Sequence, residues 1–287
     1  MTRIFNEDTR VKVPATIQFL KIGYKYQSLK DENLDIDFNT KIFINRFKPA
    51  LEKINKRSFT YDEVKNITCS IDSLIKNNDL GKEFHNWLIK PLDKVKLIDW
   101  DNIENNDFAV VDELSYSIIE NTEEGSFRPD INILVNGIPL AFLEVKKPNN
   151  DGGIRKEFDR MINERLQNDD YKKFFNMLQI VSFSNNMEYE EDDDIEDVRA
   201  GSFYTTPNGS KTSFSFFRED DNYFFDEYNY KIIDDNVIKY ITKDCGYDSD
   251  ETDTFEFKEN LKVTSPCNRF ITSLFDKERF IYFLKYG

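Results

Sequence analysis

Residues 128–148 decide the fold, and they read RPDINILVNGIPLAFLEVKKP. Apolar residues alternate along residues 129–135, which predicts a β-strand, and residues 138–145 are almost continuously apolar, which predicts a strand buried on both faces. Asn136-Gly137 between them is the strongest short hairpin signal that a sequence carries, because both residues tolerate positive φ. The stretch therefore predicts a β-hairpin at the centre of the fold.

The same hairpin carries a candidate catalytic group. Asp130 lies near the start of the first strand, and Glu144 and Lys146, two residues apart, project from one face of the second strand. A carboxylate among apolar neighbours is costly to ionise unless a cation compensates it, and carboxylate oxygens suit Mg²⁺. We expect Asp130 and Glu144 to share a divalent cation, with Lys146 orienting or deprotonating a water molecule or stabilising phosphate charge. This combination fits metal-assisted hydrolysis of a phosphodiester.

A purely structural interpretation competes with the metal site. In it, Asp130 is an exposed residue at a strand start, and Glu144 pairs with Lys146 or Arg128 at a sheet edge. The length of the turn separates the two interpretations. A two-residue turn pairs Asp130 with Leu143, whereas a three-residue loop, or an equivalent bulge, pairs Asp130 with Glu144. The metal-site hypothesis therefore predicts the three-residue loop or the bulge.

The remaining sequence predicts helices before residue 108 and a change to strands after it. Phe47, Leu51 and Ile54 recur at helical spacing, and Thr60 and Glu63 form the capping-box pattern that begins a helix. Further elements are expected as a helix over residues 79–89, strands over residues 108–111, 177–183 and 213–217, a charged helix over residues 154–166 and a closing helix over residues 268–285. Residues 188–197 include eight acidic side chains, which predicts an exposed, mobile loop.

Composition limits the classes of function. The 287-residue chain has one histidine, His85, and three widely spaced cysteines, which excludes a site with two imidazoles, a disulfide framework and a Cys-x-x-Cys zinc site. The formal net charge of -15 argues against a passive nucleic-acid-binding module, but leaves an enzyme that meets DNA through metal ions or basic partner subunits. No apolar run approaches the roughly 20 residues that cross a bilayer, and no secretory signal is present, so we expect a soluble, cytoplasmic protein without a membrane partner.

Several motifs resemble one enzyme family. The segments RPDINILVNGIPL and EVKKP within residues 128–148 closely resemble the N-terminal nuclease domain of type I restriction enzyme R (restriction) subunits. Residues 183–189 and 268–275 are similar to later stretches of the same family, and residues 278–287 resemble the segment just before its motor domains. The likeness covers about residues 80–287 and is weaker upstream. The chain is therefore expected to be a fragment of a longer R subunit.

The resemblance implies an α/β fold (an α+β mixed sheet) with a PD-(D/E)xK restriction-endonuclease-like core and an N-terminal helical region. It carries Asp130 and Glu144 over as ligands of Mg²⁺, with Mn²⁺ as a substitute, and Lys146 as the catalytic lysine. The backbone carbonyl of Val145 is a further implied ligand. Such cores often take one more carboxylate from the helix before the first strand, which nominates Glu83; the alternative for Glu83 is a solvated helix residue. The implied organisation is a mainly helical region over residues 1–107, a nuclease core over residues 108–262 and a helical connector over residues 263–287.

Two departures from the family pattern limit the transfer. The Gln-x-x-x-Tyr motif of many members falls on Arg160 and Glu164, so the roles of that motif cannot be carried over. We expect the helix to approach DNA through Arg155, Arg160 or Arg165, the alternative being an exposed helix face of mixed charge. The phosphate-binding motif Gly-x-x-x-x-Gly-Lys-[Ser/Thr] is also missing from the sequence, so ATP is expected to serve only motor domains outside this chain.

The function implied is that of a Mg²⁺-dependent endonuclease domain, an endodeoxyribonuclease that cuts double-stranded DNA after ATP-driven translocation by the motor domains. Its implied partners are double-stranded DNA and the methyltransferase and specificity subunits of a restriction complex. The isolated fragment is expected to be inactive or weak. Two alternatives remain open: a stand-alone nuclease with the same core, and a non-catalytic module that docks DNA or other subunits.

Overall fold

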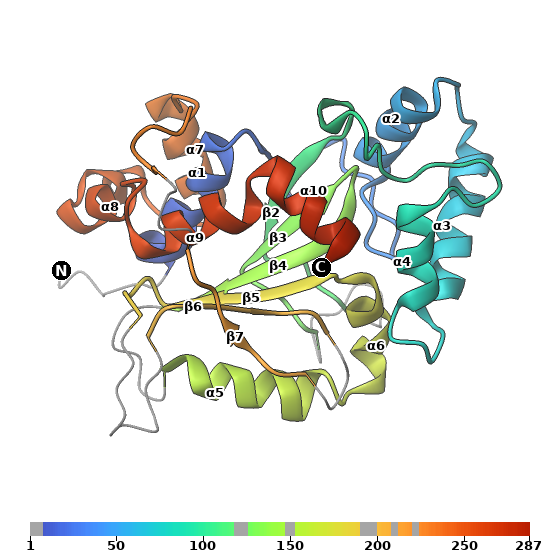
Figure 1. Ribbon diagram of the computed structural model, residues 1–287. Helices are drawn as coiled ribbons and strands as arrows, with labels where there is room; N and C mark the ends of the chain where they lie inside the picture. The colour runs from blue at the N-terminus through green and yellow to red at the C-terminus, as the bar shows by residue number, and fades with distance from the viewer. Residues whose placement is uncertain (1–7, 118–125, 147–152, 190–199, 208–211, 220–223) are drawn as a thin grey trace.

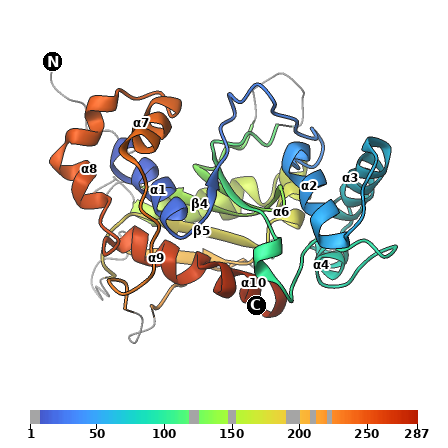
Figure 2. The ribbon, with the colours of Figure 1, turned by 90° about the horizontal axis from the view of Figure 1, so that it is seen from above.

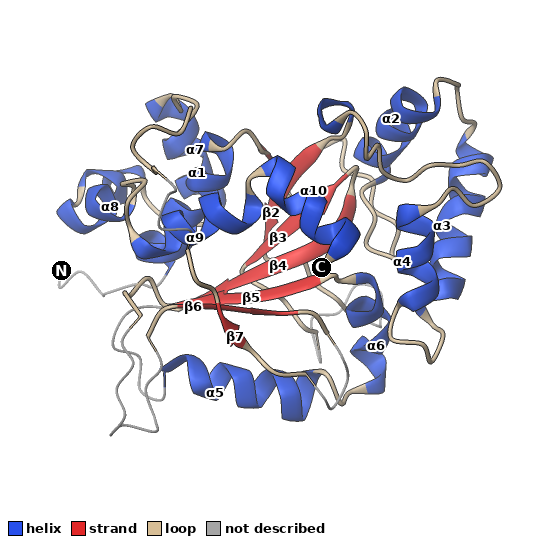
Figure 3. Ribbon diagram, viewed as in Figure 1, coloured by secondary structure: helices blue, strands red, loops and turns tan. Residues whose placement is uncertain are grey.

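The computed structural model describes residues 8–117, 126–146, 153–189, 200–207, 212–219 and 224–287. Within these residues the chain forms a seven-stranded mixed sheet with helices on both faces (Figures 1 and 3). The strands follow chain order across the sheet as β1 (Lys25–Tyr26), β2 (Phe108–Asp112), β3 (Ile131–Val135), β4 (Ile138–Val145), β5 (Ile180–Ser184), β6 (Ser202–Thr205) and β7 (Ser215–Phe216). The pairs β1–β2 and β4–β5 are parallel, and the other neighbours are antiparallel. The expected mixed α/β architecture is confirmed.

The helices divide between the two faces and the two sides of the sheet. They are α1 (Val13–Lys21), α2 (Ile44–Asn55), α3 (Tyr61–Ile75), α4 (Lys82–Ile89), α5 (Gly153–Arg160), α6 (Asp169–Met177), α7 (Asp235–Asp244), α8 (Phe255–Asn260), α9 (Pro266–Phe275) and α10 (Lys277–Tyr286). In Figure 1, α1, α9 and α10 lie above the sheet, and α5 and α6 lie below it. Figure 2 shows α7 and α8 at one side of the molecule and α2, α3 and α4 at the other.

Alternation along the strands builds two separate cores. On the face covered by α1 and α9, the sheet contributes the side chains of Phe108, Val110, Ile131, Ile133, Val135, Leu143 and Val145. On the face covered by α5 and α6, it contributes Ala109, Val111, Leu134, Phe142, Val181, Phe183 and Phe203. Successive strand residues point to opposite faces, so both faces of the central strands are buried, as the continuous apolar run of β4 predicted.

The central hairpin closes with a tight turn. Val135 pairs directly with Ile138, so the turn has two residues, and the three-residue loop expected from the sequence is wrong. Asn136 and Gly137 take φ values of 54° and 77°, the left-handed conformation that a turn of this kind requires. A Cβ atom added at Gly137 would lie 2.6 Å from the backbone oxygen of Phe43, which explains why glycine occupies the tip of the hairpin.

A bulge in β4 then restores the register that the metal-site hypothesis needs. Leu134 pairs with Pro139 and Ile133 pairs with Ala141, so Leu140 is an extra residue with no partner on β3. Leu140 and its neighbour Ala141 both contribute to the core under α1, as expected where a bulge interrupts the alternation. The equivalent bulge that the sequence analysis allowed is therefore confirmed.

Local signals located some helix starts, and two of the differences between expectation and structure have physical causes. The capping box is present, because Thr60 accepts a hydrogen bond from Glu63 N–H and the Glu63 carboxylate accepts one from Thr60 N–H. The strand expected over residues 177–183 begins only at Ile180, since residues 169–177 form α6. The single helix expected over residues 268–285 is two helices. Asp276 separates them and caps α10 by accepting from the backbone N–H groups of residues 278 and 279.

Two other expectations concern the acidic loop and membrane-spanning helices. The predicted mobile loop falls mainly on residues 190–197, which lie outside the described residues, whereas Glu188 pairs with Arg269 at 2.6 Å. Among the described residues, none of the helices combines the length and apolar character that crossing a membrane requires.

Candidate active site

The bulge brings Asp130 and Glu144 face to face at the end of the hairpin away from the turn. Ile131 pairs with Leu143, so the next opposed residues are Asp130 and Glu144. The backbone N–H of Val145 donates to Asp130 Oδ2 at 2.9 Å, and the N–H of Asp130 approaches Glu144 Oε2 at 3.4 Å. The strand register and these two contacts fix both carboxylates on the face of the sheet that α5 and α6 cover.

Lys146 completes this carboxylate–lysine site. Its Nζ atom lies 3.2 Å from Glu144 Oε1 and 3.9 Å from Asp130 Oδ2, so one ammonium group contacts both carboxylates. Glu144 is 6% exposed and Asp130 is 21% exposed, so Asp130 is the more accessible member of the pair. The three residues predicted from the hairpin sequence are therefore brought together.

The electrostatics of the site favour an additional cation. Burial raises the pKa of Asp130 well above its ordinary value, and the negative charge of Glu144 raises it further. The ammonium of Lys146 and the hydrogen bond from Val145 oppose this rise. Among the described residues, Lys146 is the lysine within ion-pair distance of both carboxylates, so a divalent cation beside them would relieve both the repulsion and the loss of solvation.

The donor atoms present fit Mg²⁺. Both side chains offer carboxylate oxygens, and the carbonyl of Val145 points to the same side of β4 as its N–H, which faces Asp130. Mg²⁺ is usually held by one or two carboxylates and keeps several water ligands, so this small set suffices. Among the described residues, groups of three or more His, Cys, Asp or Glu side chains that could hold a metal ion are absent. A metal here would therefore rest on two carboxylates and one carbonyl oxygen.

Among the other predicted site residues, Arg165 interacts with the carboxylate–lysine site. Arg165, at the end of the π-helical turn Met161–Arg165 that follows α5, stacks its guanidinium on Phe127 at 4.4 Å from the ring centroid. Burial lowers the pKa of Arg165, while the charges of Glu144 and Asp130 raise it, which places this arginine within electrostatic range of both carboxylates. Its Nη1 atom is buried and lacks a hydrogen-bond partner among the described residues. Arg165 thus interacts electrostatically with the site, and its buried Nη1 is a donor available to a ligand.

Arg160 and Glu83 are not part of the carboxylate–lysine site. Arg160 is exposed and lies 3.7 Å from Glu157 one helical turn away, and the side chain of Arg155 is outside the described residues. Glu83 is on α4 and accepts a hydrogen bond from the side chain of Asn77. Helix α4 packs against α3 and α6, at the end of the sheet where β5 begins. Glu144 lies near the opposite end of the neighbouring strand, so the structure does not bring Glu83 to the carboxylates.

Acidic and basic residues that the sequence analysis did not single out extend the site. The N–H of Glu113, the residue after β2, donates to the backbone oxygen of Asp130 at 3.0 Å. The Glu113 carboxylate in turn pairs with the buried Lys12 at 2.6 Å and lies 3.8 Å from Arg128. These side chains line a cavity of about 350 Å³. Asp112 and Glu113 are consecutive acids at the end of the apolar run 108–111, so an acidic strand end was visible in the sequence, whereas Lys12 had no local signal.

Asp112, the last residue of β2, supports this region from the face that α1 covers. Its carboxylate accepts hydrogen bonds from Thr16 Oγ1 at 2.9 Å and from Cys245 Sγ at 3.1 Å. Burial raises the pKa of Asp112 to about 6, against the opposing effects of these bonds and of Lys12. Asp112 is therefore a buried acid that ties β2 to α1 and α7.

Comparison with known proteins identifies the family of the chain. Residues 4–190 match a family model described as "Type I restriction enzyme R protein N terminus". A curated relative from Methanocaldococcus jannaschii, the "Putative type I restriction enzyme MjaIXP endonuclease subunit", is 26% identical over 239 residues, which cover 70% of this chain and 22% of the relative. The chain thus spans about a fifth of the length of that relative. All three members of the carboxylate–lysine site lie inside the matched range.

Proposed function

This chain belongs to the type I restriction enzyme R protein N-terminal family, and on that basis we propose that it is the Mg²⁺-dependent endonuclease domain of an R subunit. The observation that carries the proposal is the convergence of Asp130, Glu144 and Lys146 at the bulged end of one hairpin. Two acids and a lysine in this arrangement agree with a PD-(D/E)xK core on the mixed sheet. The substrate proposed is double-stranded DNA.

In the proposed mechanism the chain holds the reacting groups in place. Asp130, Glu144 and the carbonyl of Val145 would hold the ion, which would supply Lewis-acid stabilisation of the phosphate charge. Lys146 is positioned by Glu144, and its ammonium would orient the attacking water and stabilise charge on the phosphate. Arg165 has unused donors near both carboxylates, so it would bind a phosphate oxygen of the DNA.

The proposal extends to a larger assembly. Cleavage would follow ATP-driven translocation by motor domains outside this chain, and the methyltransferase and specificity subunits would supply recognition in a cytoplasmic complex. In this proposal residues 108–262 form the nuclease core, residues 1–107 cover it and residues 263–287 lead toward the motor. The agreement with the family and with a named endonuclease subunit supports this context.

Metal binding is the first test. Calorimetry with Mn²⁺ and Mg²⁺ should detect binding to the native chain and none to an Asp130→Ala/Glu144→Ala variant. Asp101→Ala/Glu227→Ala, which removes two exposed acids elsewhere, is the matched control and should bind as the native chain does. Binding that survives loss of Asp130 and Glu144 would move the metal away from the hairpin and contradict the proposal.

DNA cleavage is the second test, in the reconstituted complex. Glu144→Gln should abolish cleavage but leave complex assembly and ATP hydrolysis unchanged, because the substitution preserves the shape of the side chain. The formal net charge of -15 is compatible with the alternative of a non-catalytic module that docks other subunits, since a domain that closes on DNA usually carries positive charge. Loss of assembly with retained cleavage in the Glu144→Gln complex would favour that alternative.

A further inference from the structure

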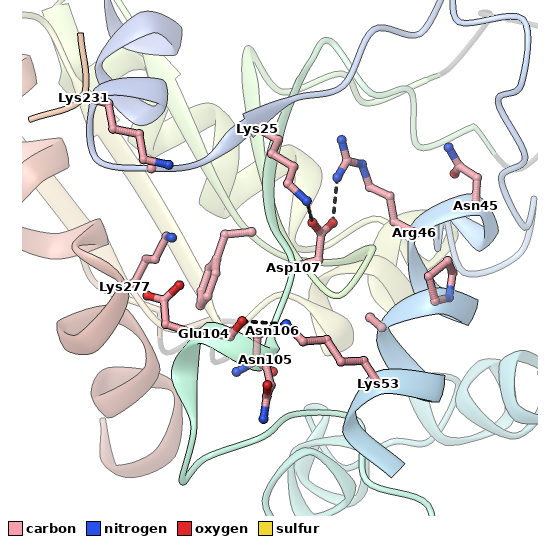
Figure 4. Close-up of a pocket in the computed structure, with 14 residues that line it drawn as sticks. Lys25, Asn45, Arg46, Lys53, Glu104, Asn105, Asn106, Asp107, Lys231 and Lys277 are labelled. Atoms are coloured by element: carbon pink, nitrogen blue, oxygen red, sulfur yellow. Dashed lines mark hydrogen bonds and ion pairs between the residues drawn. The ribbon is translucent and has the colours of Figure 1, made fainter. Parts of the chain in front are cut away.

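A second polar cavity, which we call the basic pocket, lies at the opposite end of β2 from the carboxylate–lysine site. It has a volume of about 460 Å³, and its charged lining consists of Lys25, Arg46, Lys53, Lys231, Lys277, Glu104 and Asp107 (Figure 4). Asp107 immediately precedes β2, and five strand residues at about 3.3 Å each put roughly 17 Å between this pocket and the region of Asp112. The basic pocket is therefore separate from the proposed metal site.

The charge of the basic pocket runs against that of the chain. Five basic residues face two acidic ones, whereas the whole sequence carries a formal net charge of -15. Asp107 is already satisfied, because Lys25 Nζ lies 2.5 Å from its Oδ1 and Arg46 Nη1 lies 2.6 Å from its Oδ2. Lys53 donates to the backbone oxygen of Glu104 at 2.7 Å. These three cations form a fixed wall of the pocket.

Lys231 and Lys277 form the opposite wall, and neither has an ion pair within 4.0 Å among the described residues. They converge on Gly23, where an added Cβ atom would lie 3.1 Å from Lys277 Nζ and 3.6 Å from Lys231 Cε. Figure 4 shows both side chains directed into the same space. Glu104 and, more weakly, Asp276 attract Lys277 through space, but neither comes within ion-pair distance of it.

Holding Lys277 in this position is costly without a ligand. It is the first residue of α10, where the helix dipole disfavours a positive charge. It is only partly exposed, and burial lowers the pKa of its ammonium, with the charge of Lys231 adding to the effect. A partly buried ammonium beside a second, exposed ammonium, with no ion pair to either among the described residues, is an arrangement that an anion with several acceptor oxygens would relieve.

Asn45 adds a second polar observation on the same cavity. Its side-chain Oδ1 atom is buried and lacks a hydrogen-bond partner among the described residues, although it lines the pocket. A buried amide without a partner costs free energy unless a ligand or water satisfies it. We propose that the basic pocket binds a phosphate group, with Lys231 and Lys277 donating to its oxygens and Asn45 Oδ1 accepting a hydrogen bond from a donor group next to the phosphate, such as a hydroxyl or a bound water molecule. The phosphate belongs either to a free phosphate compound or to a nucleic-acid backbone.

The test measures phosphate binding without metal, so it is independent of the proposed nuclease function. Calorimetry of the full chain in EDTA would use inorganic pyrophosphate in one arm and a short DNA duplex in the other. Lys231→Gln/Lys277→Gln should weaken binding about tenfold for each lysine that binds the phosphate, since one charge-assisted hydrogen bond corresponds to about a factor of ten. Lys65→Gln/Lys239→Gln removes two exposed lysines outside the pocket and should change the affinity less than about twofold in the pyrophosphate arm.

Each outcome decides the proposal. Lysine-dependent binding of pyrophosphate would identify a free phosphate compound, and lysine-dependent binding of the duplex alone would identify a nucleic-acid backbone. Absence of binding in both arms, or binding that Lys231→Gln/Lys277→Gln leaves unchanged, would overturn the proposal. Thermal melting of both variants checks folding, and Lys231→Gln alone, at an exposed position, provides a variant with little effect on the fold. Asp130→Ala/Glu144→Ala should retain pyrophosphate binding, which separates failure here from failure of the metal site.

Discussion

Asp112 should make the stability of the protein fall as the pH rises through the weakly acidic range. The carboxyl is buried under α1, bonded by Thr16 and Cys245, and its pKa is raised to about 6. In the unfolded chain an aspartate titrates near 3.9, so between about pH 4 and pH 6 the folded state binds the extra proton. Stability therefore decreases with increasing pH across this window, the opposite of the usual effect of a salt-bridged aspartate.

The magnitude follows from the size of the shift. About two pH units at 1.36 kcal/mol per unit give about 3 kcal/mol as the ceiling for the contribution of Asp112 to the fall in stability between pH 4 and pH 7. Asp112→Asn keeps the shape and the bond from Thr16 but removes the titration. The variant should therefore gain up to about 3 kcal/mol relative to the native chain as the pH rises, or roughly 5 °C in Tm for a chain of this length.

The assay is a pair of thermal melting series over the same pH values. Only the difference between Asp112→Asn and the native chain is used, because the other carboxyl groups titrate equally in both proteins. Asp101→Asn, at an exposed position, is the control and should follow the native curve. A difference between Asp112→Asn and the native chain that stays constant from about pH 4 to pH 7 would refute the reasoning.

Three further predictions concern the hairpin, a helix cap and the metal. Gly137→Ala should lower the free energy of unfolding by more than the about 1–2 kcal/mol of left-handed strain, because the added Cβ would lie 2.6 Å from a backbone oxygen. Gly246→Ala, where an added Cβ meets nothing within 4 Å, should cost the strain alone, and urea unfolding compares the two variants. Thr60→Ala should cost about 1 kcal/mol through loss of the capping box, measured in the same way. Mn²⁺ at about ten times its Kd should raise stability by about 1.4 kcal/mol, or roughly 2 °C in Tm, and should leave Asp130→Ala/Glu144→Ala unchanged; an equal rise in that variant would contradict the metal site.

The parts of the fold that the sequence predicted are those with local causes. The turn at Asn136-Gly137, the capping box at Thr60 and the apolar run of β4 each depend on residues a few positions apart. The need for a bulge could be inferred from the chemistry of Asp130 and Glu144, but its position could not. Leu140 is the bulged residue in the structure. Its carbonyl accepts a hydrogen bond from the backbone N–H of Gln179, just before β5, which is a contact between segments distant in sequence.

The parts that the sequence did not predict depend on tertiary contacts. The two-residue strand β1 exists because it pairs with β2, more than 80 residues further along the chain. Glu83 lies away from the carboxylates because α4, the helix before the first central strand, packs beside α3 and α6. Lys12 contacts Glu113, which is 101 residues away in the sequence. The walls of the basic pocket likewise come from segments that are distant in the sequence. Local spacing could locate the carboxylate–lysine site but could not reveal these additions to it.

The bulge at Leu140 has a consequence for how the length of this hairpin can change. Because β4 contains one residue more than regular pairing needs, loss of a single residue between the turn and Glu144 can be absorbed by straightening the strand. Asp130 then still faces Glu144. Gain of a residue in the same segment finds no such reserve, and it rotates Glu144 to the opposite face of the sheet. The spacing between the two carboxylates therefore tolerates shortening by one residue but not lengthening.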